Sequence, residues 1–218
     1  CGIQGTAPIE DAKNIALEWR NLIKKPLKCD DRTAESRYLM NWLNWKHESY
    51  AKNCRNFFID DKGQLGPFSQ LVGDLIFDDI HNNGYDSVFV KDSKDILFYC
   101  PGFSNMTVAQ KAAFHGWIFE LTAFPESSCD VNVKPNTAAP TTNAVCMYQL
   151  EDKPEIRSWR SAGQKVKRCA VSEAEINTVA GCTGCAFDEY VRKNKKHGTP
   201  FGSIDANGKK INGAYWAS

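Results

Sequence analysis

The chain has 218 residues, of which 42% are hydrophobic and 24% charged, a composition that supports a folded core and argues against disorder. Lysine and arginine number 27 against 26 aspartate and glutamate residues, so the net charge of +1 gives no general attraction to nucleic acid. The longest apolar segment, residues 112–124, is too short for a membrane helix and carries polar interruptions. We therefore expect one compact monomeric body without a membrane span.

Three helices are predicted in the first 85 residues. Apolar residues recur every three or four positions over residues 9–25. A second helix is predicted over residues 33–57, where aromatic residues follow helical spacing. A third is predicted over residues 69–81, before the turn signal Asn82-Asn83-Gly84.

The pattern changes in the middle of the chain. Short apolar runs over residues 86–100 predict small strands or extended loop. Thr107 is a suitable N-cap for a helix that is apolar on every face, which is typical of a core helix. Pro125 has no amide hydrogen, so this helix is predicted to break or kink there, which places Glu126 at the break.

The last third of the chain combines loop and helix signals. A loop rich in proline and threonine is predicted over residues 131–143, and Cys129 and Cys146 are candidates for a disulfide across it. Two further helices are predicted, over residues 151–163 and 172–195.

Nine cysteines indicate export to the periplasm or the extracellular space, where disulfides persist. Cys1 stands apart from the other eight, which suffice for four disulfides: Cys29, Cys54, Cys100, Cys129, Cys146, Cys169, Cys182 and Cys185. A chain that begins Cys1-Gly2 resembles a processed bacterial lipoprotein, which predicts a lipid anchor at Cys1 and a tether over residues 1–8. The alternative is a free or intermolecular thiol. Eight cysteines allow about 105 pairings, so connectivity stays open.

The pair Cys182 and Cys185 has the spacing of a zinc-binding or redox motif. A structural zinc site needs four close ligands, and neither a second pair nor suitably spaced histidines accompany this one. We therefore predict disulfides at this pair, no metal site and no other cofactor.

Four segments together resemble motifs of the lysozyme-like lytic transglycosylases: residues 100–103 (CPGF), 114–117 (FHGW), 124–130 (FPESSCD) and 145–150 (VCMYQL). In that family a Glu-Ser pair after a core helix is followed by a Gly-Leu-Met-Gln-like segment, and here Gln149 follows Glu126 by 23 residues. Residues 177–181 (NTVAG) are similar to a later Asn-Ile-x-x-Gly motif. One departure is Cys146, which stands where the family has a glycine.

This resemblance covers residues 99–216 and is closest to the lysozymes of predatory bacteria that select deacetylated peptidoglycan. It implies a mainly α, disulfide-stapled, goose-type lysozyme-like domain over residues 86–218, preceded by a helical N-terminal extension over residues 9–85. It also implies an enzyme whose partner is the glycan strand of peptidoglycan.

Glycosidic cleavage needs a carboxylic acid that stays protonated near neutral pH, because a proton must reach the leaving oxygen. Glu126 follows an apolar helix and Phe124-Pro125, and burial of this kind raises a carboxyl pKa, as in the well-known case of lysozyme. Glu126 is therefore the predicted general acid. Glu120 is the rival, but six residues along an unbroken helix turn two side chains about 240° apart, so both cannot face one cleft.

The remaining site residues follow from the motifs. Ser127, Tyr148, Gln149 and Tyr190 are predicted to hold the sugar or orient the acid. A second carboxylate would activate water or attack the sugar, and Asp130, Glu151 and Asp152 all remain candidates. Some members of the resembled family have no second acid and form anhydro products, so hydrolysis and transglycosylation both stay open.

Charge indicates a substrate preference. Residues 107–152 contain five acidic residues against two lysines, a difference of minus 3: Glu120, Glu126, Asp130, Glu151 and Asp152 against Lys111 and Lys134. An acidic cleft would favour glucosamine, whose free amine carries a proton, over its acetylated form. The competing hypotheses are an envelope protein that binds peptidoglycan without cleaving it and a cysteine-rich secreted inhibitor.

Overall fold

The computed structural model describes residues 12–24, 29, 36–37, 39, 41, 54, 59–60, 62–132, 144–148, 150–151, 158–161, 164–167 and 173–197. This part of the chain is mainly helical, as predicted, with two small antiparallel strand pairs. The helices are α1 (Ala12–Leu22), α3 (Pro67–Asn83), α4 (Lys94–Tyr99), α5 (Val108–Ser127), α7 (Glu173–Ile176) and α8 (Val179–His197), with 3-10 turns η1 (Gly84–Asp86) and η2 (Pro101–Asn105). The strands are β1 (Ala144–Val145), β2 (Leu150–Glu151), β3 (Ser158–Ser161) and β4 (Gln164–Lys167).

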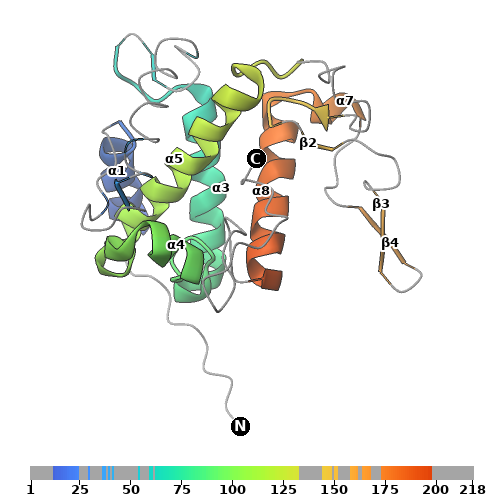
Figure 1. Cartoon of the computed structure of the whole chain (residues 1–218). Coiled ribbons are helices and arrows are strands. Elements are labelled where there is room, and N and C mark those ends of the chain that lie inside the picture. The colour runs from blue at the N-terminus through green and yellow to red at the C-terminus, as the bar shows by residue number, and fades with distance from the viewer. Residues whose placement is uncertain are drawn as a thin grey trace.

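Helix α5 is the core helix that the sequence predicts. Residues 111–121 are all buried, and α1 and α3 pack against them, while α8 lies on the side opposite α1 (Figure 1). Thr107 caps the helix as predicted, because its hydroxyl accepts the Gln110 amide while the Gln110 side chain accepts the Thr107 amide.

Trp19 of α1 packs closely against both central helices. A Cβ at Gly73 of α3 would lie 2.6 Å from the Trp19 ring, and a Cβ at Gly116 of α5 would lie 3.0 Å from Ile23, so these two glycines make the close approach possible. The Cys29–Cys100 disulfide adds a covalent tie. Residues on both sides of the expected boundary at residue 85 therefore share one hydrophobic core.

Several predicted elements are confirmed among the described residues. Helix α1 lies within the predicted 9–25 segment, and α3 contains the predicted 69–81 helix and ends at Gly84, whose φ is 55°. The predicted 172–195 helix is confirmed in part, because the chain there forms two helices, α7 and α8, separated at residues 177–178.

Three predictions are wrong. Part of residues 86–100 forms helix α4 instead of strands or extended loop, because the Ser93 hydroxyl caps the Ile96 amide and Asp95 adds a second acceptor to it. Helix α5 does not break at Pro125 but continues to Ser127. Strands β2 and β3 occupy part of the predicted 151–163 helix.

Two predicted segments fall largely outside the described residues. They are most of the helix over residues 33–57 and nearly all of the loop over residues 131–143. The tether over residues 1–8 also lies outside.

Candidate functional site

Glu126 and Ser127 occupy the last turn of α5, and Glu126 is half-buried there. The helix ends sharply at Ser128, which adopts a left-handed conformation with φ 54°. The Ser128 amide donates to the Phe124 carbonyl at 2.7 Å, and the Ser127 hydroxyl donates to the Ala123 carbonyl at 3.1 Å. These bonds satisfy the Ala123 and Phe124 carbonyl groups and close the final turn of the helix beyond Pro125.

The second segment of the site is the turn formed by Cys146, Met147 and Tyr148, called here the 146–148 turn. All three residues are buried. Strands β1 and β2 flank the turn and pair in antiparallel register, with Val145 opposite Leu150. Cys146 has φ 60°, a left-handed value that glycine adopts far more readily than other residues.

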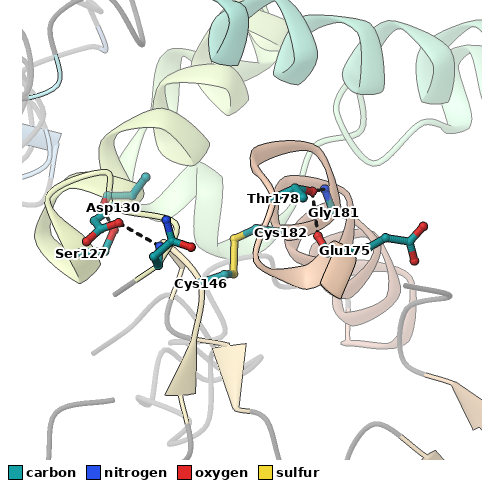
Figure 2. Close-up of a disulfide and its surroundings, with 9 residues drawn as sticks. Ser127, Asp130, Cys146, Glu175, Thr178, Gly181 and Cys182 are labelled. Atoms are coloured by element: carbon teal, nitrogen blue, oxygen red, sulfur yellow. Dashed lines mark hydrogen bonds between the residues drawn. A yellow bond between two sulfur atoms is a disulfide. The ribbon is translucent and has the colours of Figure 1, made fainter. Parts of the chain in front are cut away.

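The third segment is the junction between α7 and α8. The Thr178 hydroxyl accepts the Gly181 amide at 3.0 Å and donates to the Glu175 carbonyl at 2.7 Å, so Thr178 caps the start of α8 (Figure 2). A Cβ at Gly181 would lie 2.6 Å from the Glu175 carbonyl carbon and closer still to its oxygen. Only glycine fits at this position without a shift of the backbone.

Disulfides connect these segments, and the predicted Cys129–Cys146 pairing is wrong. Cys129 pairs with Cys54, and Cys146 pairs with Cys182 in the first turns of α8. Figure 2 shows the Cys146–Cys182 bond between the 146–148 turn and α8, and on the other side of Cys146 it shows Ser127, the last residue of α5, with Asp130 just beyond. Cys185 is also disulfide-bonded, which confirms disulfides at both cysteines of the Cys182/Cys185 pair.

No local pattern selects Cys182 as the partner of Cys146, because the pairing depends on how two distant segments pack. The start of α8 does have a local signal in the sequence. Thr178 stands just before a helical pattern, where a threonine can cap a helix start. Gly181 follows three residues later and has no side chain to keep another backbone segment away.

The predicted sugar-contacting residues have different environments. Ser127 is 9% exposed and Tyr148 is 2% exposed, packed between Phe68 and Phe119 at ring-centroid distances of 6.3 Å each. Gln149 lies outside the described residues. The hydrophobic environment of Tyr148 fits a supporting role under the turn better than contact with a glycan.

Tyr190 is a core residue, which removes the basis for placing it in a cleft. It is 1% exposed, and its hydroxyl lies 2.7 Å from Nδ1 of His115 on α5. Burial, together with the nearby charge of Lys111, lowers the pKa of His115 to about 3, so this imidazole is neutral. The pair joins α5 to α8 through a neutral hydrogen bond.

The candidates for a second carboxylate are only partly placed. Asp130 is exposed, three residues beyond the end of α5, and its amide donates to the Ser127 carbonyl at 3.1 Å. Glu151 belongs to β2, and Asp152 lies outside the described residues. Asp130 is therefore the one candidate shown to be solvent-accessible near Glu126.

Glu120 differs sharply from Glu126 although both lie on α5. Its side chain is fully buried, and within the described residues neither carboxyl oxygen completes a hydrogen bond of good geometry. Burial raises the pKa of Glu120 well above its usual value of 4.5, and the Ser69 hydroxyl of α3 opposes only part of this shift. Because α5 is unbroken, Glu120 faces the core while Glu126 reaches a different side of the helix.

We expect Glu120→Gln to change how stability depends on pH. The unfolded chain releases the Glu120 proton near pH 4.5, whereas the folded chain keeps it. The wild-type free energy of unfolding therefore falls by about 1.4 kcal/mol per pH unit from pH 4.5 up to the folded-state pKa, relative to the variant. Urea unfolding of both proteins at pH 5, 6 and 7 measures the difference, and parallel profiles would show that Glu120 is ionised in the folded state.

Other features of the described residues set the chemistry available. They contain no group of three or more His, Cys, Asp or Glu side chains arranged to hold a metal ion. No helix in the described part of the chain combines the length and hydropathy needed to cross a bilayer. No family model, curated protein or solved structure matches the chain.

Proposed function

We propose that this protein cleaves the glycan strands of peptidoglycan with Glu126 as the general acid. The observation that carries the proposal is the arrangement of three segments that resemble lysozyme-like motifs. The Cys146–Cys182 disulfide joins the 146–148 turn to the start of α8. Figure 2 draws Ser127, at the end of α5, on the other side of Cys146, although these three segments are distant in sequence.

Backbone geometry supports the resemblance at two positions where it specifies glycine. Cys146 stands in the place of the family's glycine, and it adopts the left-handed conformation that glycine favours. Gly181 ends the Asn-Thr-Val-Ala-Gly segment, and no side chain fits there. The reasons differ, a left-handed backbone at Cys146 and a lack of space for a Cβ at Gly181, but glycine is favoured at both positions.

Glu126 meets the physical requirements of a general acid better than Glu120. It lies half-buried at the end of an apolar helix, partly screened from water but within reach of a substrate. Fully buried Glu120 has no route to a glycan. Asp130 and Glu151 are the candidates to activate water after glycosidic cleavage, and the lytic transglycosylase reaction, which ends in an anhydro sugar, needs neither of them.

The expected substrate is deacetylated peptidoglycan. Two charged residues of segment 107–152 drop out of the surface balance, because Glu120 is fully buried and Lys111 pairs with Asp92 at 2.9 Å. Glu126 carries a proton in its proposed role, so Asp130, Glu151 and Asp152 remain against Lys134, a difference of minus 2. A protonated glucosamine amine is favoured by such a field, and salt should weaken the preference.

Mass spectrometry of digests of acetylated and deacetylated peptidoglycan tests the function and the preference together. We expect soluble fragments from both substrates and faster release from the deacetylated one. Reducing ends identify hydrolysis and anhydro ends identify transglycosylation. Equal rates on both would contradict the charge argument. Binding without fragments would establish the non-catalytic alternative, an envelope protein that binds peptidoglycan, and absence of binding would favour the inhibitor hypothesis.

A further inference from the structure

The Cys146–Cys182 disulfide joins a weakly supported turn to a firmly held helix start. On the turn side, β1 and β2 contribute only two residues each, and such a short strand pair is marginal by itself. Cys146 also holds a left-handed backbone conformation that is unfavourable for a residue with a Cβ. The turn therefore needs an additional tie to keep this geometry.

The helix side supplies a rigid attachment point. The Cys182 amide donates to the Thr178 carbonyl at 2.9 Å, one residue after Gly181, whose amide is capped by the Thr178 hydroxyl. Cys146 and Cys182 are both fully buried. The disulfide therefore transmits the fixed position of the α8 start to the turn beside it.

The turn also contacts α5, the helix that carries the candidate acid, and α3. Tyr148 packs against Phe119 of α5 and Phe68 of α3. On the far side of the site, the Cys54–Cys129 disulfide holds Cys129, another residue with positive φ, just after the end of α5. Among the described residues, the non-glycine residues with positive φ are Ser128, Cys129 and Cys146, and all three belong to this site.

We propose that the Cys146–Cys182 disulfide is a positioning element of the glycan site. It holds the 146–148 turn in the left-handed geometry that a glycine would otherwise provide and keeps the turn aligned with the end of α5. Cys146 and Cys182 are positioning residues and take no part in proton transfer. The proposal rests on the proposed function for its effect on glycan cleavage, but the effect on the turn itself is independent of that function.

Two double variants separate the crosslink from the backbone conformation. Cys146→Ser/Cys182→Ser removes the bond and leaves a residue that disfavours positive φ. Cys146→Gly/Cys182→Ser removes the same bond but suits the left-handed conformation. The matched control is Cys29→Ser/Cys100→Ser, which removes a disulfide that ties the N-terminal part to the junction of α4 and η2.

The first readout is hydrogen exchange of the wild-type and variant full-length chains. We expect amides of the 146–148 turn to exchange about tenfold faster in the Ser/Ser variant at 146 and 182, with partial recovery in the Gly/Ser variant. Amides in the first half of α5 should be unchanged. The control should leave exchange in the turn at the wild-type rate.

The second readout is steady-state cleavage of soluble peptidoglycan fragments. We expect kcat/KM to fall about tenfold in the Ser/Ser variant, mainly through KM, because Glu126 stays in place on α5 while the turn moves. The Gly/Ser variant should recover most of the loss, and the control should keep both constants.

Unchanged turn exchange in a folded Ser/Ser variant would overturn the proposal. If circular dichroism shows that both variants at 146 and 182 fail to fold, the disulfide is a requirement of the whole fold and the proposal is also wrong. If wild type cleaves no glycan but the exchange pattern appears, the proposed function fails while positioning of the turn stands.

Discussion

Glu126→Gln is expected to slow glycan cleavage by about 100- to 10,000-fold while leaving the fold intact, since this is the range that general acid catalysis contributes. Glutamine has nearly the same shape as glutamic acid but cannot release a proton to the leaving oxygen. Glu126 lies in the last turn of α5 and is only half-buried, so the substitution creates no cavity in the core. The measurement is the rate of fragment release from peptidoglycan, with circular dichroism to verify the fold.

Glu120→Gln is the matched control for this experiment. It makes the same chemical change six residues earlier on the same helix, at a carboxyl whose pKa burial raises well above its usual value. Because Glu120 faces the core, we expect this variant to keep the wild-type cleavage rate. If Glu126→Gln cleaves normally and Glu120→Gln does not, the acid has been assigned to the wrong residue. If both keep the wild-type rate, neither carboxyl is the acid.

The helical core was predictable because its signals are local. The apolar pattern of α5 extends over several turns, and Thr107 and Gln110 stand at the spacing of a capping box. The end of α3 at Gly84 follows from a glycine that adopts positive φ. In each case, the residues that determine the element lie within a few positions of one another.

Local rules failed where more distant contacts decide the structure. Proline disfavours a helix around Pro125, yet α5 continues because left-handed Ser128 and Cys129 close its end and the disulfide to Cys54 holds Cys129. The disulfide partners are separated by 36 to 75 residues, and spacing carries no information about such pairings.

The candidate site was predictable only in part. The motifs selected the segments to compare, and two of them, the 146–148 turn and the start of α8, are joined by the Cys146–Cys182 disulfide. They did not predict which aromatic side chains face solvent. Tyr148 and Tyr190 are buried because α3, α5 and α8 enclose them, which depends on tertiary packing rather than on the residues beside them in the chain.

Among the glycines of the described residues, Gly181 is where substitution by alanine is expected to lower the stability most. The new Cβ would overlap the Glu175 carbonyl group, which is backbone and cannot rotate away, so α7 and the start of α8 must separate. Thr178 would then lose its bonds to Glu175 and Gly181. We expect a loss of about 3 kcal/mol or more, which for a chain of this size lowers Tm by about 6–12 °C.

Gly184→Ala on the same helix tests whether this loss comes from the clash. A Cβ at Gly184 meets nothing within 4 Å, so alanine there should raise stability by about 0.4–1 kcal/mol through its higher helix propensity. The two variants add the same methyl group three residues apart, and calorimetry should therefore show opposite shifts in Tm. Similar shifts for both would mean that α7 does not press against α8 at Gly181. Cys182 is the next residue and is bonded to Cys146, so a clash at Gly181 should also displace the 146–148 turn. We therefore expect slower glycan cleavage even at temperatures below the melting range.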